Sequence, residues 1–280
     1  MIREFSFKTS DNELLSVTTF QPYENKNDIL NVLVFAHGFK GFKDWGFGPY
    51  IGEYFSKRGF FVITFNFSHN GIGGNKFEFT ELDKFADNTI SREVRELIEI
   101  SNAVKSGYFG ELDEAKIGLL GHSRGGVVSI LAASKSKILS AITTWASIFN
   151  LNRFSERQIH EWKERGFVEI MNARTKQKMK LNLALLNDIE QNSNDYLNVE
   201  KAIIELKIPL LIAHGKEDLA VSVSEAEMIY ESSDKNLSRM ILINGAGHTF
   251  NVQHPFSGSN PKFENLLEET HKFFVNSFAK

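Results

Sequence analysis

Residues 117–128 of the chain read Ile117-Gly118-Leu119-Leu120-Gly121-His122-Ser123-Arg124-Gly125-Gly126-Val127-Val128. An apolar run leads into a Gly-x-Ser-x-Gly pattern, and residues typical of a helix follow. A serine on a sharp turn between strand and helix needs small residues two positions before and after it, which Gly121 and Gly125 provide. Free N–H groups and the positive dipole at the helix start would stabilise an oxyanion above Ser123. The stretch predicts a nucleophilic serine, and the alternative is an ordinary glycine-rich turn.

The composition is that of a globular protein. Of 280 residues, 42% are hydrophobic and 24% are charged, which suits one large α/β domain or two small ones. The net charge of −3 indicates no basic surface, so we expect neither nucleic acid nor an acidic membrane as a partner. The chain has no cysteine, which excludes disulfides, a thiol nucleophile and cysteine-ligated zinc.

The amino-terminal residues carry no targeting signal that we can identify. Residues 1–8 alternate apolar and polar side chains and lack the apolar core of a secretory signal. The sequence also has no run of about 18 apolar residues, the length that a membrane span needs. We therefore expect a cytoplasmic protein.

Hydrophobic periodicity predicts strands and helices in alternation. Residues 2–8 and 14–20 alternate with period two and predict an antiparallel hairpin. Further strands are predicted at 31–36, 60–65, 117–120, 138–145, 209–213 and 239–243, and helices at 50–58, 82–106 and 263–278. This order predicts the α/β class, with a mostly parallel sheet, an N-terminal antiparallel hairpin and helices on both faces. In such sheets the sites lie at the carboxyl ends of the strands.

One region interrupts the alternation. More than sixty residues separate Trp145 from Pro209, about twice what a strand-helix-strand step needs. Residues 157–164 and 181–191 show helical periodicity, and a basic stretch joins them, with Arg174, Lys176, Lys178 and Lys180. We interpret residues 149–198 as a helical cap inserted into a core of residues 1–148 and 199–280, because long insertions usually have functional reasons. A surface insertion without a role is the alternative.

A serine hydroxyl needs a base within hydrogen-bond reach and an acid that orients the base. Among eight histidines, His248 follows the last predicted strand, after the flexible Gly245 and Gly247, and His254 in the same loop is the rival. For the acid, Asp218 follows the strand at 209–213, and the adjacent Glu217 is the rival. Ser123, Asp218 and His248 each follow a different strand and predict a catalytic triad.

The order Ser, Asp, His and four short motifs resemble the α/β-hydrolase superfamily over nearly the whole chain. The similar segments are the nucleophile segment Gly121-His122-Ser123-Arg124-Gly125-Gly126, the acid loop His214-Gly215-Lys216-Glu217-Asp218-Leu219-Ala220-Val221, the histidine loop Gly245-Ala246-Gly247-His248 and the oxyanion loop His37-Gly38-Phe39. The resemblance favours Asp218 over Glu217 and His248 over His254. Within the superfamily, the chain is most similar to the feruloyl/cinnamoyl esterase and serine-aminopeptidase-like branch, which carries a helical insertion at the corresponding place.

The resemblance implies a serine hydrolase that cleaves a carboxylic ester through an acyl-enzyme, without a cofactor or metal. Ser123 would attack the carbonyl carbon, His248 would take the serine proton, and Asp218 would orient His248. The backbone N–H groups of Phe39 and Arg124 would hold the oxyanion. We expect the partner to be a small-molecule ester with a small or aromatic acyl group, and we leave a homodimer open.

Aromatic residues near the strand ends and in the cap are candidates for the acyl pocket. We expect substrate-binding roles for Phe42, Trp145, Phe149 and Trp162, with packing in the core or cap as the alternative for each. A peptidase or amidase that acts on a free amino terminus is the alternative function, and it would need an acidic cap residue at the pocket, such as Glu156, Glu161 or Glu164. A non-catalytic binding protein is the third hypothesis, which the retained triad disfavours.

Overall fold

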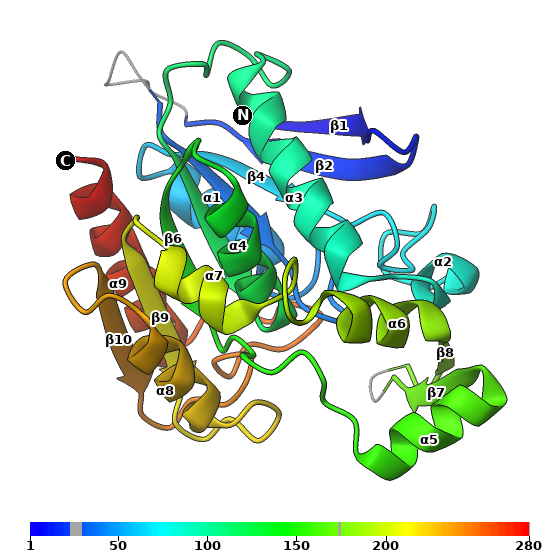
Figure 1. Cartoon of the computed structure of the whole chain (residues 1–280). Coiled ribbons are helices and arrows are strands. Elements are labelled where there is room, and N and C mark those ends of the chain that lie inside the picture. The colour runs from blue at the N-terminus through cyan, green and yellow to red at the C-terminus, as the bar shows by residue number, and fades with distance from the viewer. Residues whose placement is uncertain (23–29, 173–174, 280) are drawn as a thin grey trace.

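An eight-stranded sheet runs through the part of the chain that the computed structural model describes, residues 1–22, 30–172 and 175–279 (Figure 1). Its spatial order is β1-β2-β4-β3-β5-β6-β9-β10. The strands are β1 (Ile2–Lys8), β2 (Leu14–Phe20), β3 (Val32–Ala36), β4 (Phe61–Phe65), β5 (Ile117–His122), β6 (Leu139–Trp145), β9 (Leu210–Gly215) and β10 (Ser238–Ile243).

The sheet is parallel from β4 to β10, whereas β1 pairs antiparallel with β2 and β2 antiparallel with β4. The predicted α/β class with an N-terminal antiparallel hairpin is therefore confirmed. Strand β5 lies between β3 and β6. Because the parallel strands end at one edge, the loops after β3, β5, β9 and β10 come together there.

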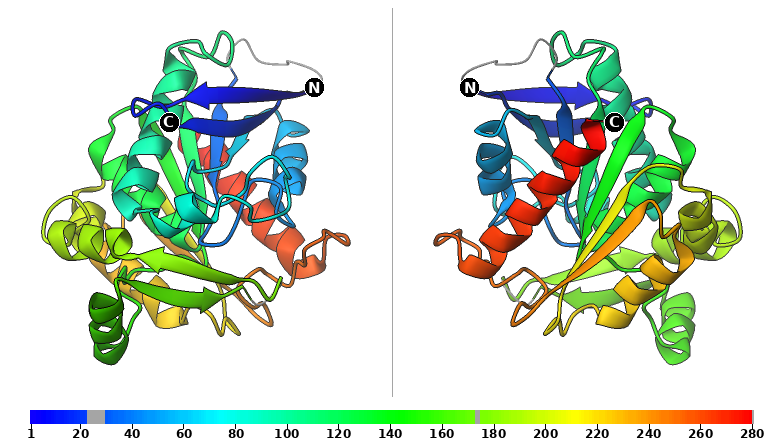
Figure 2. Two further views of the ribbon diagram at one scale, coloured as in Figure 1. Left: turned by 90° about the vertical axis from the view of Figure 1, so that its right-hand side faces the viewer. Right: turned by 90° about the vertical axis from the view of Figure 1, so that its left-hand side faces the viewer.

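Helices cover both faces of the sheet, as continuous apolar strands require (Figure 2). The helices α1 (Gly48–Ser56) and α9 (Pro261–Phe278) pack on one face in an aromatic-rich core. The helices α3 (Ile90–Lys105), α4 (Arg124–Lys135), α7 (Val199–Glu205) and α8 (Val223–Ser232) pack on the other. In the described part of the chain, none of the helices combines the length and apolar character needed to cross a bilayer.

The helix predicted over residues 82–106 is two helices. A short helix α2 (Leu82–Ala86) ends before α3 begins at Ile90. Thr89 adopts an extended backbone, and its hydroxyl accepts a hydrogen bond from the N–H of Arg92 at 3.2 Å. A threonine that caps the second helix in this way ends the continuous periodicity that the apolar residues suggest.

The insertion after β6 contains two helices, as predicted, and also a β-hairpin. Its elements are α5 (Glu156–Arg165), β7 (Phe167–Met171), β8 (Lys178–Asn182) and α6 (Leu183–Asn192). The last part of the expected basic stretch forms the start of β8, where exposed Lys178 and Lys180 alternate with buried Met179 and Leu181. That period of two is a strand signal. Arg174 lies outside the described residues.

Candidate active site

Ser123 lies at the turn between β5 and α4 in a strained conformation. Its φ of 55° and ψ of −122° are rare for a residue with a side chain, and such strain of order 1–3 kcal/mol concentrates at functional sites. The turn is closely packed: a Cβ on Gly121 would lie 2.2 Å from the carbonyl oxygen of Gly125, and one on Gly125 would lie 2.2 Å from that of Ala36. The two glycines of the pattern are therefore required by steric fit.

The loops after β9 and β10 bring Asp218 and His248 together. Nδ1 of His248 lies 2.7 Å from Oδ2 of Asp218, and Oδ1 of Asp218 accepts the N–H groups of Ala220 and Val221 at 2.8 and 2.9 Å. Burial alone would raise the pKa of Asp218, but hydrogen bonds from His214, His248 and the Val221 N–H outweigh it and hold the pKa below its ordinary value. Asp218 is thus a buried carboxylate at neutral pH, suited to orient an imidazole.

The two rivals lie elsewhere. Glu217 is exposed to solvent. Nδ1 of His254 accepts the N–H of Gly46 at 2.9 Å, and the imidazole stacks on Trp45 with a centroid distance of 5.9 Å. His254 therefore packs against the loop before α1, while His248 contacts the buried acid.

Two further histidines hold the loops of the site. Nε2 of His122 donates to the carbonyl oxygen of His248 at 2.9 Å, and Nδ1 of His37 donates to that of Gly38 at 3.0 Å. Burial lowers the pKa of His122 to about 3 and that of His37 to about 4. Both rings are therefore neutral, and each carries its proton on the nitrogen that faces a carbonyl.

The loop after β3 passes directly against the nucleophile turn. A Cβ on Gly38 would lie 2.8 Å from Cβ of Ser123, so only glycine permits this approach. The next residue, Phe39, stacks on Phe85 at 5.5 Å, and the guanidinium of Arg124 lies 4.4 Å from the centroid of the Phe39 ring. In the described ranges, the N–H groups of Phe39 and Arg124 donate to no acceptor.

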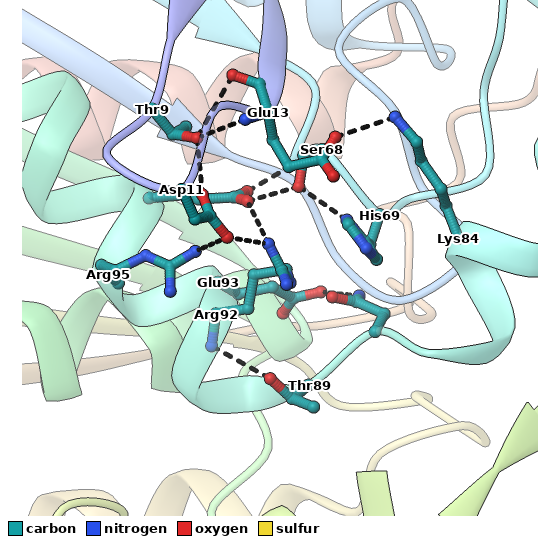
Figure 3. Close-up of polar contacts among 12 residues, drawn as sticks. Thr9, Asp11, Glu13, Ser68, His69, Lys84, Thr89, Arg92, Glu93 and Arg95 are labelled. Carbon is teal, nitrogen blue, oxygen red and sulfur yellow. Dashed lines mark hydrogen bonds and ion pairs between the residues drawn. The ribbon is translucent and has the colours of Figure 1, made fainter. Parts of the chain in front are cut away.

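The side chain of Arg124 is held by an ion pair with a buried glutamate on α3. Its Nη2 donates to Oε1 of Glu93 at 2.5 Å, and Nδ2 of Asn88 donates to the same oxygen at 2.7 Å. Figure 3 shows Glu93 on its helix beside Arg92. Glu93 is not among the residues predicted from the sequence, although a charged residue three positions after Ile90 on an otherwise apolar helix face signals a buried pair.

Ser123 and His248 line two adjoining pockets. The larger has a volume of about 460 Å³ and is lined by apolar residues of the insertion, among them Leu151, Phe154, Ile170, Leu181, Leu185 and Ile189. The smaller, about 170 Å³, is lined by aromatic residues, among them Phe35, Phe42, Trp45 and Phe47. Both are also lined by Phe39 and Lys40.

Of the four predicted substrate contacts, only Phe42 lines one of these two pockets. Trp145 is fully buried next to the pocket-lining Phe47, with ring centroids 6.2 Å apart, and its indole N–H donates to Oγ1 of Thr270 on α9 at 3.0 Å. Trp162 is buried behind Phe154, with ring centroids 4.8 Å apart. Phe149 packs against the core beside the pocket wall. Whether Trp145, Phe149 and Trp162 reach a pocket depends on the direction of their side chains in the folded chain, which composition does not specify.

The acidic residues of α5 also lie away from the pockets. Glu156, Glu161 and Glu164 are exposed, and Glu161 and Glu164 pair along the helix with Arg157 and His160. None of the three lines either pocket beside Ser123. The helix instead turns its single buried residue, Trp162, toward the core.

Comparison with known families identifies the family of the chain. The model of the prolyl oligopeptidase family matches residues 45–280. The chain belongs to the prolyl oligopeptidase family. The matched residues include the nucleophile turn, the acid loop and the histidine loop of this chain.

Relatives of this prolyl oligopeptidase family member include esterases and a peptidase. The esterase candidate YitV of Bacillus subtilis (strain 168) is 23% identical over 216 residues, covering 77% of this chain and 79% of that protein. Est1E of Butyrivibrio proteoclasticus with bound ferulic acid has a TM-score of 0.72 at 19% identity, covering 99% and 100% of the two chains. A puromycin-hydrolysing peptidase of Mycobacterium tuberculosis has a TM-score of 0.69 at 15% identity and covers 99% of this chain and 39% of the other. The structural matches show the α/β-hydrolase fold.

Proposed function

We propose that this chain is a carboxylic-ester hydrolase that works through an acyl-enzyme on Ser123. The observation that carries the proposal is the 2.7 Å contact between His248 and the buried Asp218, at a pocket wall that His248 shares with the strained Ser123. An imidazole held at Nδ1 keeps its Nε2 available as a base for the serine hydroxyl. A buried carboxylate, an imidazole and a strained serine at one sheet edge support a catalytic role.

In the first half-reaction, Oγ of Ser123 attacks the ester carbonyl carbon while Nε2 of His248 takes the hydroxyl proton. The carbonyl oxygen becomes an oxyanion, which the N–H groups of Phe39 and Arg124 bind. The tetrahedral intermediate collapses, the bond to the alcohol oxygen breaks, and His248 returns its proton to the departing alcohol. Each oxyanion donor contributes about 3 kcal/mol to lowering the barrier.

In the second half-reaction, His248 removes a proton from water, and the hydroxide attacks the acyl carbon of the Ser123 ester. The second intermediate expels Oγ of Ser123, which recovers its proton from His248, and the carboxylic acid leaves. Asp218 stays ionised throughout and stabilises the imidazolium that forms in both halves.

We assign the acyl group to the small or aromatic class. The smaller pocket of about 170 Å³ has an aromatic lining and suits a compact acyl group. The name of the Est1E structure, with bound ferulic acid, agrees with an aromatic acyl group. We also propose that residues 149–198 form a cap on a core of residues 1–148 and 199–280, because the insertion contributes most of the apolar wall of the larger pocket.

The alternative is a peptidase or amidase, which the family name and the puromycin-hydrolysing relative favour. An enzyme that recognises a free amino terminus needs a carboxylate beside its ammonium group. The described lining of the two pockets contains no aspartate or glutamate. The ester hydrolase is therefore the better supported function.

The test compares hydrolysis of p-nitrophenyl acetate, butyrate and octanoate with that of methyl ferulate and an aminoacyl anilide. We expect short-chain or ferulate ester cleavage by the wild type and none by Ser123→Ala. Ser134→Ala, on the same helix but remote from the turn, is the matched control and should retain the activity. Ester cleavage that survives in Ser123→Ala would refute the assignment of the nucleophile. Anilide cleavage with poor ester turnover would favour the amidase, and a folded protein without turnover would favour a binding role.

A further inference from the structure

The charged residues that line the larger pocket are all cationic. They are Lys40, Arg124 and Arg153, and the described lining contains no aspartate or glutamate. This is unusual for a chain whose net charge is −3. Apart from Ser123 and His248, the rest of the lining is apolar.

Two of the three cations are already neutralised by carboxylates. Arg124 pairs with Glu93 at 2.5 Å. Arg153 pairs with Glu225, and its other terminal nitrogen donates to the carbonyl oxygen of Ala220 at 2.9 Å. These contacts hold the guanidinium groups at the pocket wall and leave little net charge for a ligand.

Lys40 differs from both arginines. In the described part of the chain its ammonium forms no ion pair, and its polar contact is a long hydrogen bond, 3.4 Å, to the carbonyl oxygen of Met171. Nζ lies 5.7 Å from the centroid of the Phe39 ring, and the side chain is half-buried at the wall shared by both pockets. Burial lowers the pKa of Lys40. Removing an ammonium from water without a counter-charge is unfavourable, and a bound anion would offset it.

We propose that this enzyme hydrolyses esters that carry an anionic group, such as a carboxylate, and that Lys40 binds that group. The inference rests on the ester hydrolase proposed above and specifies its substrate class. Lys40 directly follows Phe39, whose N–H is assigned to the oxyanion, so an anion bound by Lys40 lies near the scissile ester. The apolar pocket walls accommodate the hydrocarbon part between the ester and the anion.

A structural role for Lys40 makes a different prediction. Through the carbonyl oxygen of Met171, Lys40 joins the oxyanion loop to the hairpin of the insertion. If this were its only role, replacing it would change the hydrolysis of neutral and anionic esters by the same factor. The ratio of the two rates therefore separates substrate recognition from support of the insertion.

The experiment measures kcat/KM for two matched pairs of esters. The p-nitrophenyl monoester of adipic acid against p-nitrophenyl hexanoate places the anion on the acyl side. The para-carboxyphenyl ester of acetic acid against its para-carbamoylphenyl analogue places it on the alcohol side. We expect the wild type to prefer the anionic member of at least one pair by about tenfold, the effect of one hydrogen bond to a charged group.

In Lys40→Met the preference should fall to near one, and Lys40→Arg should restore part of it. Lys57→Met, which removes an exposed lysine remote from the site, is the charge-matched control and should keep the preference. If Lys40→Met does not fold, the wild-type preference should still decline as NaCl rises from about 0.02 to about 0.5 M.

The inference is overturned if the wild type hydrolyses neutral esters but prefers the anionic member of neither pair. It is also overturned if a preference survives unchanged in Lys40→Met or is insensitive to salt. Failure of the proposed function looks different, because Ser123→Ala would then cleave the neutral esters as fast as the wild type does.

Discussion

The guanidinium carbon of Arg124 lies 4.4 Å from the centroid of the Phe39 ring. The two residues whose N–H groups we assign to the oxyanion thus hold each other through their side chains. Phe39 also stacks on Phe85, and Arg124 is bound by Glu93. A cation–π contact of this kind contributes about 1 kcal/mol, and here it joins two loops that must stay in register. Glu93 is therefore a positioning residue for the oxyanion site.

Glu93→Gln should lower kcat about tenfold, equivalent to about 1.4 kcal/mol of barrier, while KM changes less. The amide leaves Arg124 without its counter-charge, so the guanidinium is held less firmly over Phe39. Glu96→Gln is the matched control, because Glu96 is buried on the same helix and contacts Ser68 instead. Steady-state kinetics on a p-nitrophenyl ester measures both variants. Equal losses of kcat in the two would show that Glu93 acts only through general packing.

Asp218→Asn should lower kcat about ten-thousandfold with the fold intact, because an amide cannot hold the required imidazole tautomer or balance its charge. The comparison variant is Glu217→Gln, one residue earlier in the same loop but exposed, and it should match the wild type. Both are assayed with the ester that the wild type cleaves fastest. If instead Glu217→Gln were inactive and Asp218→Asn active, the role of orienting His248 would be assigned to Glu217.

The sequence predicts those features that depend on local geometry. Gly121 and Gly125 can be predicted as part of a nucleophile turn because that turn tolerates no larger residue. The strands can be predicted because both faces of a parallel sheet are apolar. The approach of Asp218 to His248 follows from topology, since each lies after a strand that ends at the same edge.

Features that depend on how side chains point across the fold are not predictable in this way. Trp145 ends a strand at the catalytic edge, yet its ring is buried between Phe47 and α9 and does not reach either pocket. Lys40 and Glu93 acquire their roles only from partners distant in the chain. Only Glu93 carries a signal in the sequence, as a charged residue on a helix face whose neighbours are apolar.

Gly38→Ala should lower kcat/KM at least tenfold. The added methyl group would lie 2.8 Å from Cβ of Ser123, and it must displace either the nucleophile or the loop that carries Phe39. An error of about 1 Å in such a site costs roughly a hundredfold in rate. Gly74→Ala is the control, since its methyl group would meet no atom within 4 Å. Thermal unfolding of both variants, followed by circular dichroism, separates displacement from loss of fold. Wild-type kinetics in Gly38→Ala would contradict the assigned loop position.

The last prediction concerns Glu96, a buried residue of α3 whose Oε1 accepts a hydrogen bond from the hydroxyl of Ser68, and Ser68 in turn contacts Nδ1 of His69 at 2.8 Å. Burial raises its pKa from 4.5 to about 7, opposed by hydrogen bonds from Ser68 and the charge of Arg92. Between about pH 4.5 and 7 the folded chain therefore binds more protons at Glu96 than the unfolded chain does. By linkage, this group lowers the stability as the pH rises through that range, by up to about 3 kcal/mol.

His69 acts with the opposite sign, because burial lowers its pKa from 6.5 to about 4, and its contribution to stability is lost as the pH falls through that interval. Glu96→Gln should consequently raise the free energy of unfolding at pH 8 relative to pH 5 by about 2.5 kcal/mol compared with the wild type. The loss of stability in acid that His69 causes should remain in the variant. Urea unfolding at several pH values measures the difference. Parallel stability curves for the variant and the wild type would mean that Glu96 keeps an ordinary pKa in the folded chain.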